Sequence, residues 1–356
     1  MTSYKESFLS LVRMGIGHRA DTLTHIVDWS ELKVISEKQG LSAIVLDGIE
    51  RLPEQIRPPK KFLLEWIGIT LQGYEYRYEQ YQRTIAEMAR FYNSHGYKMM
   101  VLKGYACSLD WPKPEHRPCG DVDVWLFGNQ KEADAALEKE KFIEIDKKHE
   151  HHTVFYWNDF MVENHYDFIN TRRHKSHYDL EGIFKELGAD ESHYCELYGE
   201  KVYLPSPNLH ALFLVRHILK HFAAVEISLR QVLDWAFFVE KHSKEIDWNW
   251  LDEMLDKYNM KDFYGCLNAI CVEDLGFDAC LFNEVQFIPS IKAKVLDDIL
   301  FPRYPLVEPK GFLRKYAYKY RRWKGNEWKH RLCYKESRRT EFWQGIRAHV
   351  FKPTDV

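Results

Sequence analysis

The stretch that most constrains the fold is Cys119–Leu126, which reads CGDVDVWL. Side chains along a strand point to opposite faces in turn, so Asp121 and Asp123 share one face while Val122 and Val124 share the other. Two carboxylates roughly 7 Å apart along a strand repel each other. A divalent cation is the usual group that offsets such repulsion. The stretch therefore predicts a short strand with one face for a core and one acidic face for a metal.

Length and composition are those of a folded protein with two or three packed units. The chain has 356 residues, of which 45% are hydrophobic and 29% charged, so it can bury a substantial core. A net charge of -3 does not indicate nucleic-acid binding by the chain as a whole. Seven cysteines without zinc or CxxC spacing predict reduced thiols in a cytoplasmic protein. No apolar run approaches the roughly 18 residues that cross a bilayer, so no transmembrane segment is expected.

Hydrophobic periodicity predicts helices toward both ends of the chain and strands between them. Asp28 and Glu31 are expected to cap one helix as a pair, and residues 60–94 are expected to form one long helix. The other expected helices lie at 130–141, 179–187, 207–222, 228–242, 247–258 and 262–275. The expected strands lie at 98–102, 121–127, 142–146, 151–157, 161–168 and 201–205.

This order of elements predicts an α+β fold, with a small mixed β-sheet core flanked by N-terminal and C-terminal helical regions. The expected divisions are an N-terminal helical region at 1–96, an α/β core at 97–206, a helical substrate-side domain at 207–300 and a basic aromatic segment at 301–356.

Three motifs in a fixed order carry a resemblance to a known family. They are Leu102-Lys103-Gly104, Arg117-Pro118-Cys119-Gly120-Asp121-Val122-Asp123 and Val162-Glu163-Asn164-His165-Tyr166. The pattern resembles an uncharacterised bacterial nucleotidyltransferase family within the DNA polymerase β-like nucleotidyltransferase superfamily. The helix from Pro207 to His221, with its paired histidines, and the Arg230–Asp234 stretch look like the helical part of that family.

The resemblance implies an enzyme that moves a nucleoside monophosphate from an NTP to an acceptor hydroxyl and releases pyrophosphate. It implies Asp121, Asp123 and Glu163 as catalytic residues and ligands of a two-metal site, with Mg²⁺ as the cation and Mn²⁺ as the alternative. His165 and Asp167 become substrate-side candidates. Glu163, His165 and Asp167 share one face at period two, so the alternation leaves open whether Glu163 or Asp167 is the third acid.

The residues expected at the triphosphate are Lys103, Gly104, Ser108, Arg117 and Gly120. Arg117 offers a planar donor fork for phosphate oxygens, and Lys103 is either a phosphate ligand or a solvated charge at a strand end. Gly120 would let backbone and phosphate approach closely. Ser108 is a substitute for the usual phosphate-contacting hydroxyl.

Histidines and charges on the later helices have several readings. His217 and His221 lie four apart on one helix face, which suits zinc binding, stacking at the substrate or packing between helical and catalytic parts. Arg230 and Asp234 are expected to pair within their helix, with a substrate role for Arg230 as a second reading. The cluster of His149, His151 and His152 is interpreted as an exposed turn rather than a metal site.

The C-terminal segment interleaves basic and aromatic residues, as at Arg321-Arg322-Trp323. Residues 301–352 are therefore read as a contact for an anionic membrane surface, as a nucleic-acid contact, or as a solvated helix that folds back on the acidic remainder. Two alternatives to the main function are a non-catalytic nucleotide- or partner-binding module and a toxin-like nucleotidyltransferase that acts on tRNA or protein. The acceptor and the preferred NTP stay open.

Overall fold

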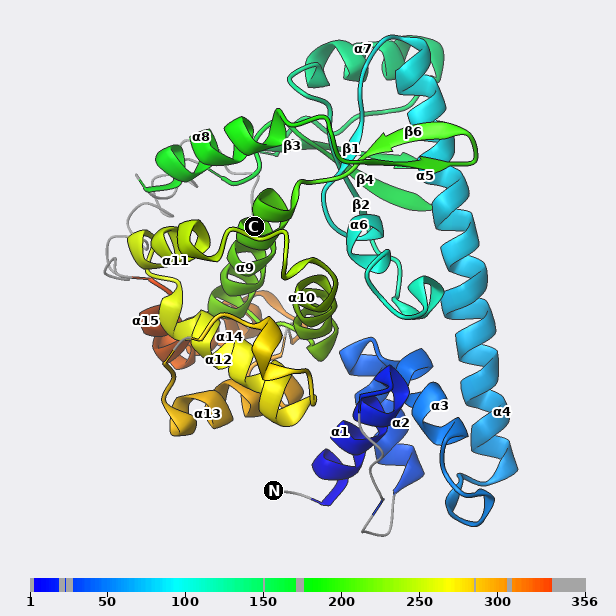
Figure 1. Ribbon diagram of the computed structural model, residues 1–356. Helices are drawn as coiled ribbons and strands as arrows, with labels where there is room; N and C mark the ends of the chain where they lie inside the picture. The colour runs from blue at the N-terminus through cyan, green and yellow to red at the C-terminus, as the bar shows by residue number, and fades with distance from the viewer. Residues whose placement is uncertain are drawn as a thin grey trace. The chain divides into compact units, whose positions relative to one another are not determined.

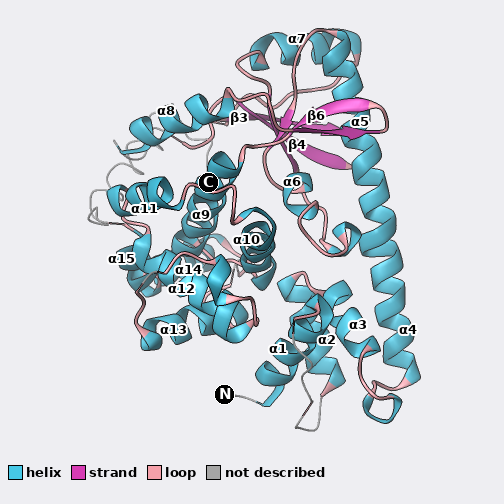
Figure 2. Cartoon of the chain, viewed as in Figure 1, coloured by secondary structure: helices cyan, strands magenta, loops and turns pink. Residues whose placement is uncertain are grey.

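The computed structural model describes residues 3–18, 23, 28–149, 151–170, 176–284, 286–305 and 309–334. Figure 1 shows the order of the elements, and Figure 2 shows that helices predominate and that the strands gather together. The chain divides into two compact units. The first unit takes its described residues from Met1–Tyr76, Asp110–Pro118 and Leu214–Lys335, and the second takes them from Arg77–Leu109 and Cys119–Phe213.

The second unit is built on one mixed sheet of six strands, in the order β3-β4-β2-β1-β6-β5. Strand β2 runs parallel to β4 and β1 parallel to β6, whereas the other neighbouring pairs are antiparallel. This sheet, with helices before and after it along the chain, confirms the predicted α+β class. The strands are β1 Met100–Val101, β2 Val122–Trp125, β3 His152–Trp157, β4 Phe160–His165, β5 Tyr194–Leu197 and β6 Glu200–Tyr203.

One face of this sheet carries the hydrophobic core of the second unit. Val122 and Val124 of β2 are fully buried there with apolar side chains of α5 (Arg77–Ser94) and α7 (Gln130–Glu140). Burying that surface stabilises the unit by about 25 cal/mol per Å² of apolar area. Because side chains alternate along a strand, Asp123 must then point to the opposite face. Two further helices of this unit are α6 Tyr105–Ser108 and α8 Ser176–Gly188.

The first unit is helical in its described residues. The side chain of Asp28 accepts hydrogen bonds from the backbone of Ser30 and Glu31, which confirms the predicted cap of α2. Helix α9 Pro207–Ala224 starts in the second unit and ends in the first. The helices are α1 Ser3–Ile16, α2 Trp29–Gln39, α3 Ser42–Glu50, α4 Lys60–Ile69, α10 Leu229–His242, α11 Trp248–Lys257, α12 Lys261–Ala269, α13 Pro289–Leu300, α14 Phe312–Gly325 and α15 Glu327–Cys333. There are also short 3₁₀-helices, η1 Glu54–Ile56, η3 Pro114–His116 and η5 Ala279–Leu281, and a π-helical segment after α12, η4 Ile270–Asp274.

Several predicted elements differ in the structure. The expected helix over 60–94 is α4 and α5 joined by a π-helical segment, η2 Thr70–Tyr76. The expected strand at 142–146 is wrong, since only Asp146 forms an isolated bridge there. Phe142 is 89% exposed and has a positive φ of 53°, which breaks an extended run at its first residue.

Strand β5 was not expected from the sequence. It forms an antiparallel hairpin with β6, and the turn between them holds Tyr198 at φ 50° and Gly199 at φ 80°. Two successive residues with positive φ match the turn that joins tightly twisted hairpin strands. Gly199 is the signal that could have pointed to this hairpin.

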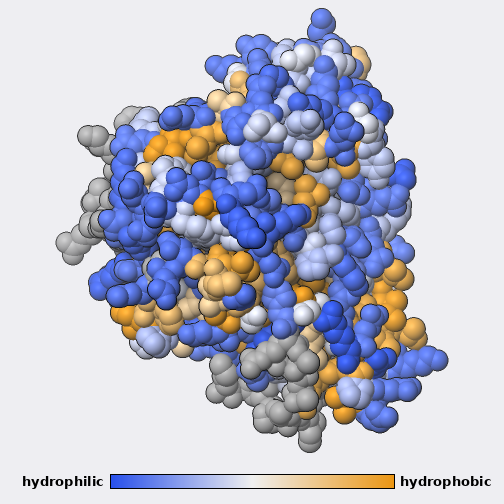
Figure 3. Space-filling view, in the orientation of Figure 1, coloured by the Kyte–Doolittle hydropathy of each residue, from blue (hydrophilic) through white to orange (hydrophobic). Residues whose placement is uncertain are grey.

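The surface drawn in Figure 3 is mostly hydrophilic, with hydrophobic patches between the polar residues. In the described part of the chain, no helix has the length and apolarity needed to cross a membrane.

Candidate functional site

Asp123 and Glu163 lie next to each other on the sheet face opposite the core. They are partners in the parallel register of β2 and β4 (Figure 1). The side chain of Asp123 is 1% exposed and that of Glu163 is 20% exposed. His165 follows on the same face, with Nε2 3.1 Å from Asp123 Oδ1 and 3.4 Å from Glu163 Oε2. One ligand atom from each of these three residues lies within 4.8 Å of the others.

Lys103 supplies a second cation to the same carboxylate. Strand β1 ends just before it, where Leu102 N donates to the carbonyl of Asp123 at 3.0 Å. This backbone bond brings Lys103 Nζ to 2.8 Å from Asp123 Oδ1. The lysine predicted at the triphosphate therefore lies on a buried acid, and the reading as a solvated strand-end charge is wrong.

The charges of this group balance one another in a buried setting. Burial raises the pKa of Asp123 and Glu163, but the neighbouring Lys103 and His165 outweigh it and hold both values below the usual range. Burial lowers the pKa of His165, yet its contacts with Asp123 and Glu163 raise it to about 9. Lys103 is likewise kept above its usual pKa by the acids, against the effect of burial. The like-charge repulsion expected from the sequence is thus offset by the protein's own cations.

Asp121 lies just before β2 and is half-buried. Its pKa is raised by burial and then by the charge of Asp123. Its carbonyl oxygen accepts a hydrogen bond of 2.8 Å from the hydroxyl of Tyr81. Among the described residues, Asp121 is not part of the close group of Asp123, Glu163 and His165. Its carboxylate is nevertheless near enough for the charges of Asp123 and Glu163 to raise its pKa.

The oxygen atoms of this site fit a divalent cation. Asp123 Oδ2 is buried and has no hydrogen-bond partner among the described residues. A buried carboxylate oxygen without a partner is costly unless a cation or a proton takes that place. Carboxylate oxygens are the ligands that Mg²⁺ and Mn²⁺ prefer. The side chains of Asp121, Asp123 and Glu163 thus suit the cation that the sequence implied.

Residues 25–276, more than half of the chain, match the family described as uncharacterised nucleotidyltransferase. The chain belongs to this family. A solved structure similar to it is an antigenic nucleotidyltransferase-like protein from Paracoccidioides brasiliensis, with 16% identity, a TM-score of 0.33, and coverage of 45% of this chain and 75% of that one. No curated protein matches the chain.

Gly104 and Gly120, both expected at the triphosphate, differ in their surroundings. Gly104 has a φ of +59°, and a Cβ there would lie 2.5 Å from the hydroxyl of Tyr81, so the fold itself requires glycine. Gly120 is exposed, and a Cβ there would meet nothing within 4 Å. The fold therefore does not require glycine at 120. Because glycine has no side chain, the space beside Asp121 is open.

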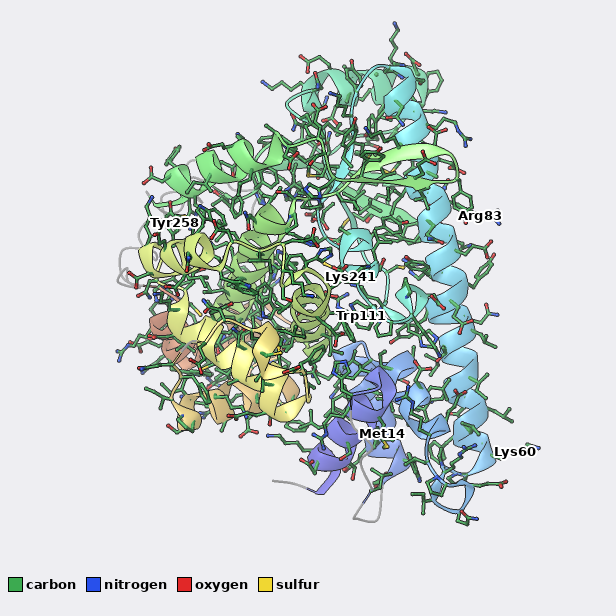
Figure 4. The ribbon with its side chains drawn as sticks, in the orientation of Figure 1. Met14, Lys60, Arg83, Trp111, Lys241 and Tyr258 are labelled. Atoms are coloured by element: carbon green, nitrogen blue, oxygen red, sulfur yellow. The ribbon has the colours of Figure 1, made fainter. Side chains whose placement is uncertain are left out.

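Ser108 and Arg117, both expected at the triphosphate, are engaged inside the protein. Ser108 Oγ is buried and donates to the carbonyl of Tyr105 at 2.6 Å. Arg117 is 5% exposed, and its Nε and Nη2 donate to the two oxygens of Asp234 at 2.7 and 3.0 Å. Asp234 also accepts from Trp111 Nε1 at 3.0 Å, and Figure 4 labels Trp111 beside α10. Arg117 therefore holds both oxygens of Asp234, the acid that was expected to pair with Arg230 within its helix.

Asp167, the competing third acid, lies beyond the end of β4. Its carboxylate pairs with Lys185 of α8. In the described residues, it is not part of a close group of metal-ligating side chains. The geometry therefore favours Glu163 over Asp167 as the acid beside Asp123.

His217 and His221 share a helix face as expected, with ring centroids 4.4 Å apart. Both are half-buried in the part of α9 that belongs to the first unit. Within the described ranges, neither belongs to a cluster with metal-ligand spacing. Packing or substrate contact are the readings that remain for this pair.

The interpretation of residues 149–152 as an exposed turn is wrong for His152. That residue starts β3 and lies directly across from His165 in the antiparallel register with β4. It is 8% exposed, and burial lowers its pKa to about 4. The pairing of strands distant in sequence, which periodicity does not reveal, places a second histidine beside the acidic site.

Proposed function

We propose that this chain is a divalent-cation-dependent nucleotidyltransferase that moves a nucleoside monophosphate from an NTP to an acceptor hydroxyl and releases pyrophosphate. The observation that carries the proposal is the pair of Asp123 and Glu163 on adjacent parallel strands, with Asp123 Oδ2 buried and without a partner in the described residues. Membership of a nucleotidyltransferase family supports the reaction class.

Asp121, Asp123 and Glu163 are the residues that would hold the cation. When bound, Mg²⁺ or Mn²⁺ would neutralise charge on the phosphates and lower the pKa of the acceptor hydroxyl. Glu163 is the acid of the pair with the larger exposure, which suits it to receive the proton of the acceptor hydroxyl at a carboxylate oxygen.

Lys103 and His165 are the positive counter-charges of the acidic site. Both contact Asp123 Oδ1, so each compensates the acid before a cation and a triphosphate arrive. Lys103 is 18% exposed and has a flexible stem, so its ammonium can turn to a phosphate oxygen once Asp123 has another counter-charge. Gly120, with open space where a side chain would stand, lets the triphosphate approach the backbone before Asp121.

Labelled NTPs test this proposal directly. Purified chain is incubated with each of the four α-³²P-labelled NTPs, Mg²⁺ or Mn²⁺, and fractionated acceptors: small metabolites, RNA and protein. We expect label to move to one acceptor class with stoichiometric pyrophosphate, and we expect the transfer to vanish in Asp121→Asn and Asp123→Asn. NTP binding without transfer to any fraction would favour the binding-module alternative. Label on tRNA or on a protein would favour the toxin-like alternative.

We also propose that α14 contacts an anionic membrane surface. None of its residues is buried, and its fourteen residues carry six basic and no acidic side chains. Large apolar side chains are exposed along it at helical spacing, from Phe312 at 73% and Tyr316 at 58% to Tyr320 at 59% and Trp323 at 38%. Basic residues attract anionic lipid, and aromatic rings lie at the headgroup level.

The cytoplasm is the setting that we propose for this reaction. All seven cysteines lie in the described residues and are thiols without disulfides. Reduced thiols are usual where glutathione and thioredoxin keep cysteines reduced.

A further inference from the structure

We propose that His151, His152 and His165 form a binding site for Zn²⁺ beside the acidic site. One nitrogen from each imidazole lies within 4.8 Å of the others. This site adjoins the carboxylates, since His165 Nε2 contacts both Asp123 and Glu163, but it does not depend on the proposed transfer reaction.

The sheet holds the three imidazoles together. His152 and His165 are register partners of the antiparallel β3–β4 pair, so their side chains leave the same sheet face at adjacent positions. Their ring centroids are 5.3 Å apart, and the ring of His151 lies 4.4 Å from that of His152 and 5.8 Å from that of His165. Two of the three ligands thus stand on rigid strands, which favours a site of fixed geometry.

A buried nitrogen in this cluster lacks a partner. His152 is 8% exposed, and its Nδ1 has no hydrogen-bond partner among the described residues. Burying such a group without a hydrogen bond costs free energy. A metal ion at this nitrogen would remove that cost. An apolar residue would otherwise suit this position in a strand better.

The second nitrogen of His165 shows how its ring is oriented. Nδ1 of His165 lies 3.3 Å from the carbonyl oxygen of Asp167, to which it can donate its proton. A ligating histidine almost always donates its other ring N–H to such an oxygen, which fixes the tautomer and the ring plane. That contact is already present here, so Nε2, which contacts Asp123 and Glu163, is the nitrogen left for the metal, and the metal would displace the proton from it.

The chemistry of three imidazoles selects the class of ion. Imidazole nitrogen suits Zn²⁺, Ni²⁺ and Cu²⁺, whereas Mg²⁺ and Mn²⁺ prefer carboxylate and water oxygens. Three histidines with one open position are also a known arrangement for zinc. The two sites therefore distinguish between ions, so saturating Mg²⁺ can fill the acidic site and leave the histidines for the transition metal.

Calorimetry of the tag-free full chain tests this site. The protein is stripped of metal with EDTA, saturated with Mg²⁺, and titrated with ZnCl₂. We expect one equivalent of Zn²⁺ to bind, and its affinity to fall roughly tenfold or more in His152→Gln and in His151→Gln. His193→Gln, a histidine of the same unit outside the cluster, should bind as the unmodified chain does. Co²⁺ as a replacement ion gives a visible absorption band from nitrogen ligation, which should disappear with the same two variants.

Two results would overturn the inference: no stoichiometric binding of Zn²⁺ to the unmodified chain, or binding that falls in Glu163→Gln while both histidine variants bind normally. The second result would assign the ion to the carboxylates. Circular dichroism checks that each variant is folded, and His151→Gln, at a half-buried position, decides the matter if His152→Gln does not fold. Asp121→Asn separates this inference from the proposed function, because it should lose nucleotidyl transfer and keep Zn²⁺ binding.

Discussion

Asp123 and Glu163 lie opposite each other in the parallel register of β2 and β4, and His165 Nε2 is within 3.4 Å of a carboxylate oxygen of each. The two acids therefore share one proton-bearing imidazole and, through Asp123, one ammonium from Lys103. This arrangement has different consequences for the two aspartates of the sequence motif.

Asp121→Asn and Asp123→Asn should both reduce transfer by roughly two orders of magnitude or more, since bound metal supplies several kcal/mol of stabilisation. Their stabilities should differ. Asp123→Asn removes the buried counter-charge of Lys103 and His165 and should lower the free energy of unfolding by about 1–3 kcal/mol. Asp121→Asn removes a carboxylate that burial and Asp123 disfavour, so the free energy of unfolding should stay level or rise. Urea unfolding of the metal-free chains measures this, and equal losses for both variants would contradict the charge assignment.

Gly104→Ala should destabilise the chain, whereas Gly120→Ala should not. Alanine at 104 must accept a φ of +59° and a contact of 2.5 Å with the Tyr81 hydroxyl, at a cost of about 1–3 kcal/mol. Alanine at 120 meets no atom within 4 Å, so the free energy of unfolding should change by less than about 0.5 kcal/mol. If the triphosphate passes over Gly120, the Kd for NTP should nevertheless rise in that variant. Thermal unfolding and NTP calorimetry give the two readouts, and an unchanged Kd would remove Gly120 from the phosphate site.

Asp234→Ala should be strongly destabilising. It leaves the buried Arg117 guanidinium without its counter-charge, which costs about 3–5 kcal/mol, and it removes the acceptor of Trp111. The double variant Arg117→Met, Asp234→Leu should recover part of the loss. A matched control is Glu327→Gln, in an exposed pair with Arg331, which should cost about 0–1 kcal/mol. Equal losses in Asp234→Ala and in Glu327→Gln, measured by urea unfolding, would contradict a structural role for the buried pair.

Glu181 should make stability depend on pH. Burial raises its pKa from 4.5 to about 7, against the hydrogen bonds from Phe168 N and Ile169 N. Between those two values the folded state binds more protons than the unfolded state, so the free energy of unfolding should fall as pH rises from 4.5 to about 7. Glu181→Gln cannot titrate and should show a flatter profile of Tm against pH. The exposed Glu186→Gln in the same helix should keep the slope of the unmodified chain, and the same slope in Glu181→Gln would rule out this carboxyl as its source.

The full chain should bind anionic vesicles through α14 and sediment with them, and this binding should weaken as the salt concentration rises. The full chain is mixed with phosphatidylserine-containing or neutral phosphatidylcholine vesicles, at low and high salt. Phe312→Ser with Trp323→Ser should weaken binding by removing the apolar contacts, and Arg321→Glu with Arg322→Glu by removing the charge. Arg331→Gln, a cation of the next helix, should bind as the unmodified chain does. Binding to RNA but not to vesicles would assign the surface to nucleic acid instead.

Much of the fold followed from local patterns. Val122 and Val124 could be assigned to a core face, and Asp28 to a helix cap, because strand alternation and N-cap chemistry depend only on neighbouring residues. Strand β6 was expected at 201–205, but its hairpin partner β5 was missed because β5 is short and the signal of the turn is confined to Gly199. The strand expected at 142–146 failed because Phe142 adopts a positive φ, which a hydrophobic pattern does not report.

Local sequence sufficed to place Asp123 and Glu163 on strands, since alternation acts over a few residues. Asp121, expected on the same strand as Asp123, lies just before it. The packing of the whole fold determined which side chains lie opposite these acids. Strand register set Glu163 opposite Asp123 and His152 opposite His165, and burial drew Arg117 to Asp234 instead of to a solvent-facing phosphate site. These partners lie 13 to 117 residues apart along the chain, a separation at which pairing depends on the free energy of the whole fold and not on spacing.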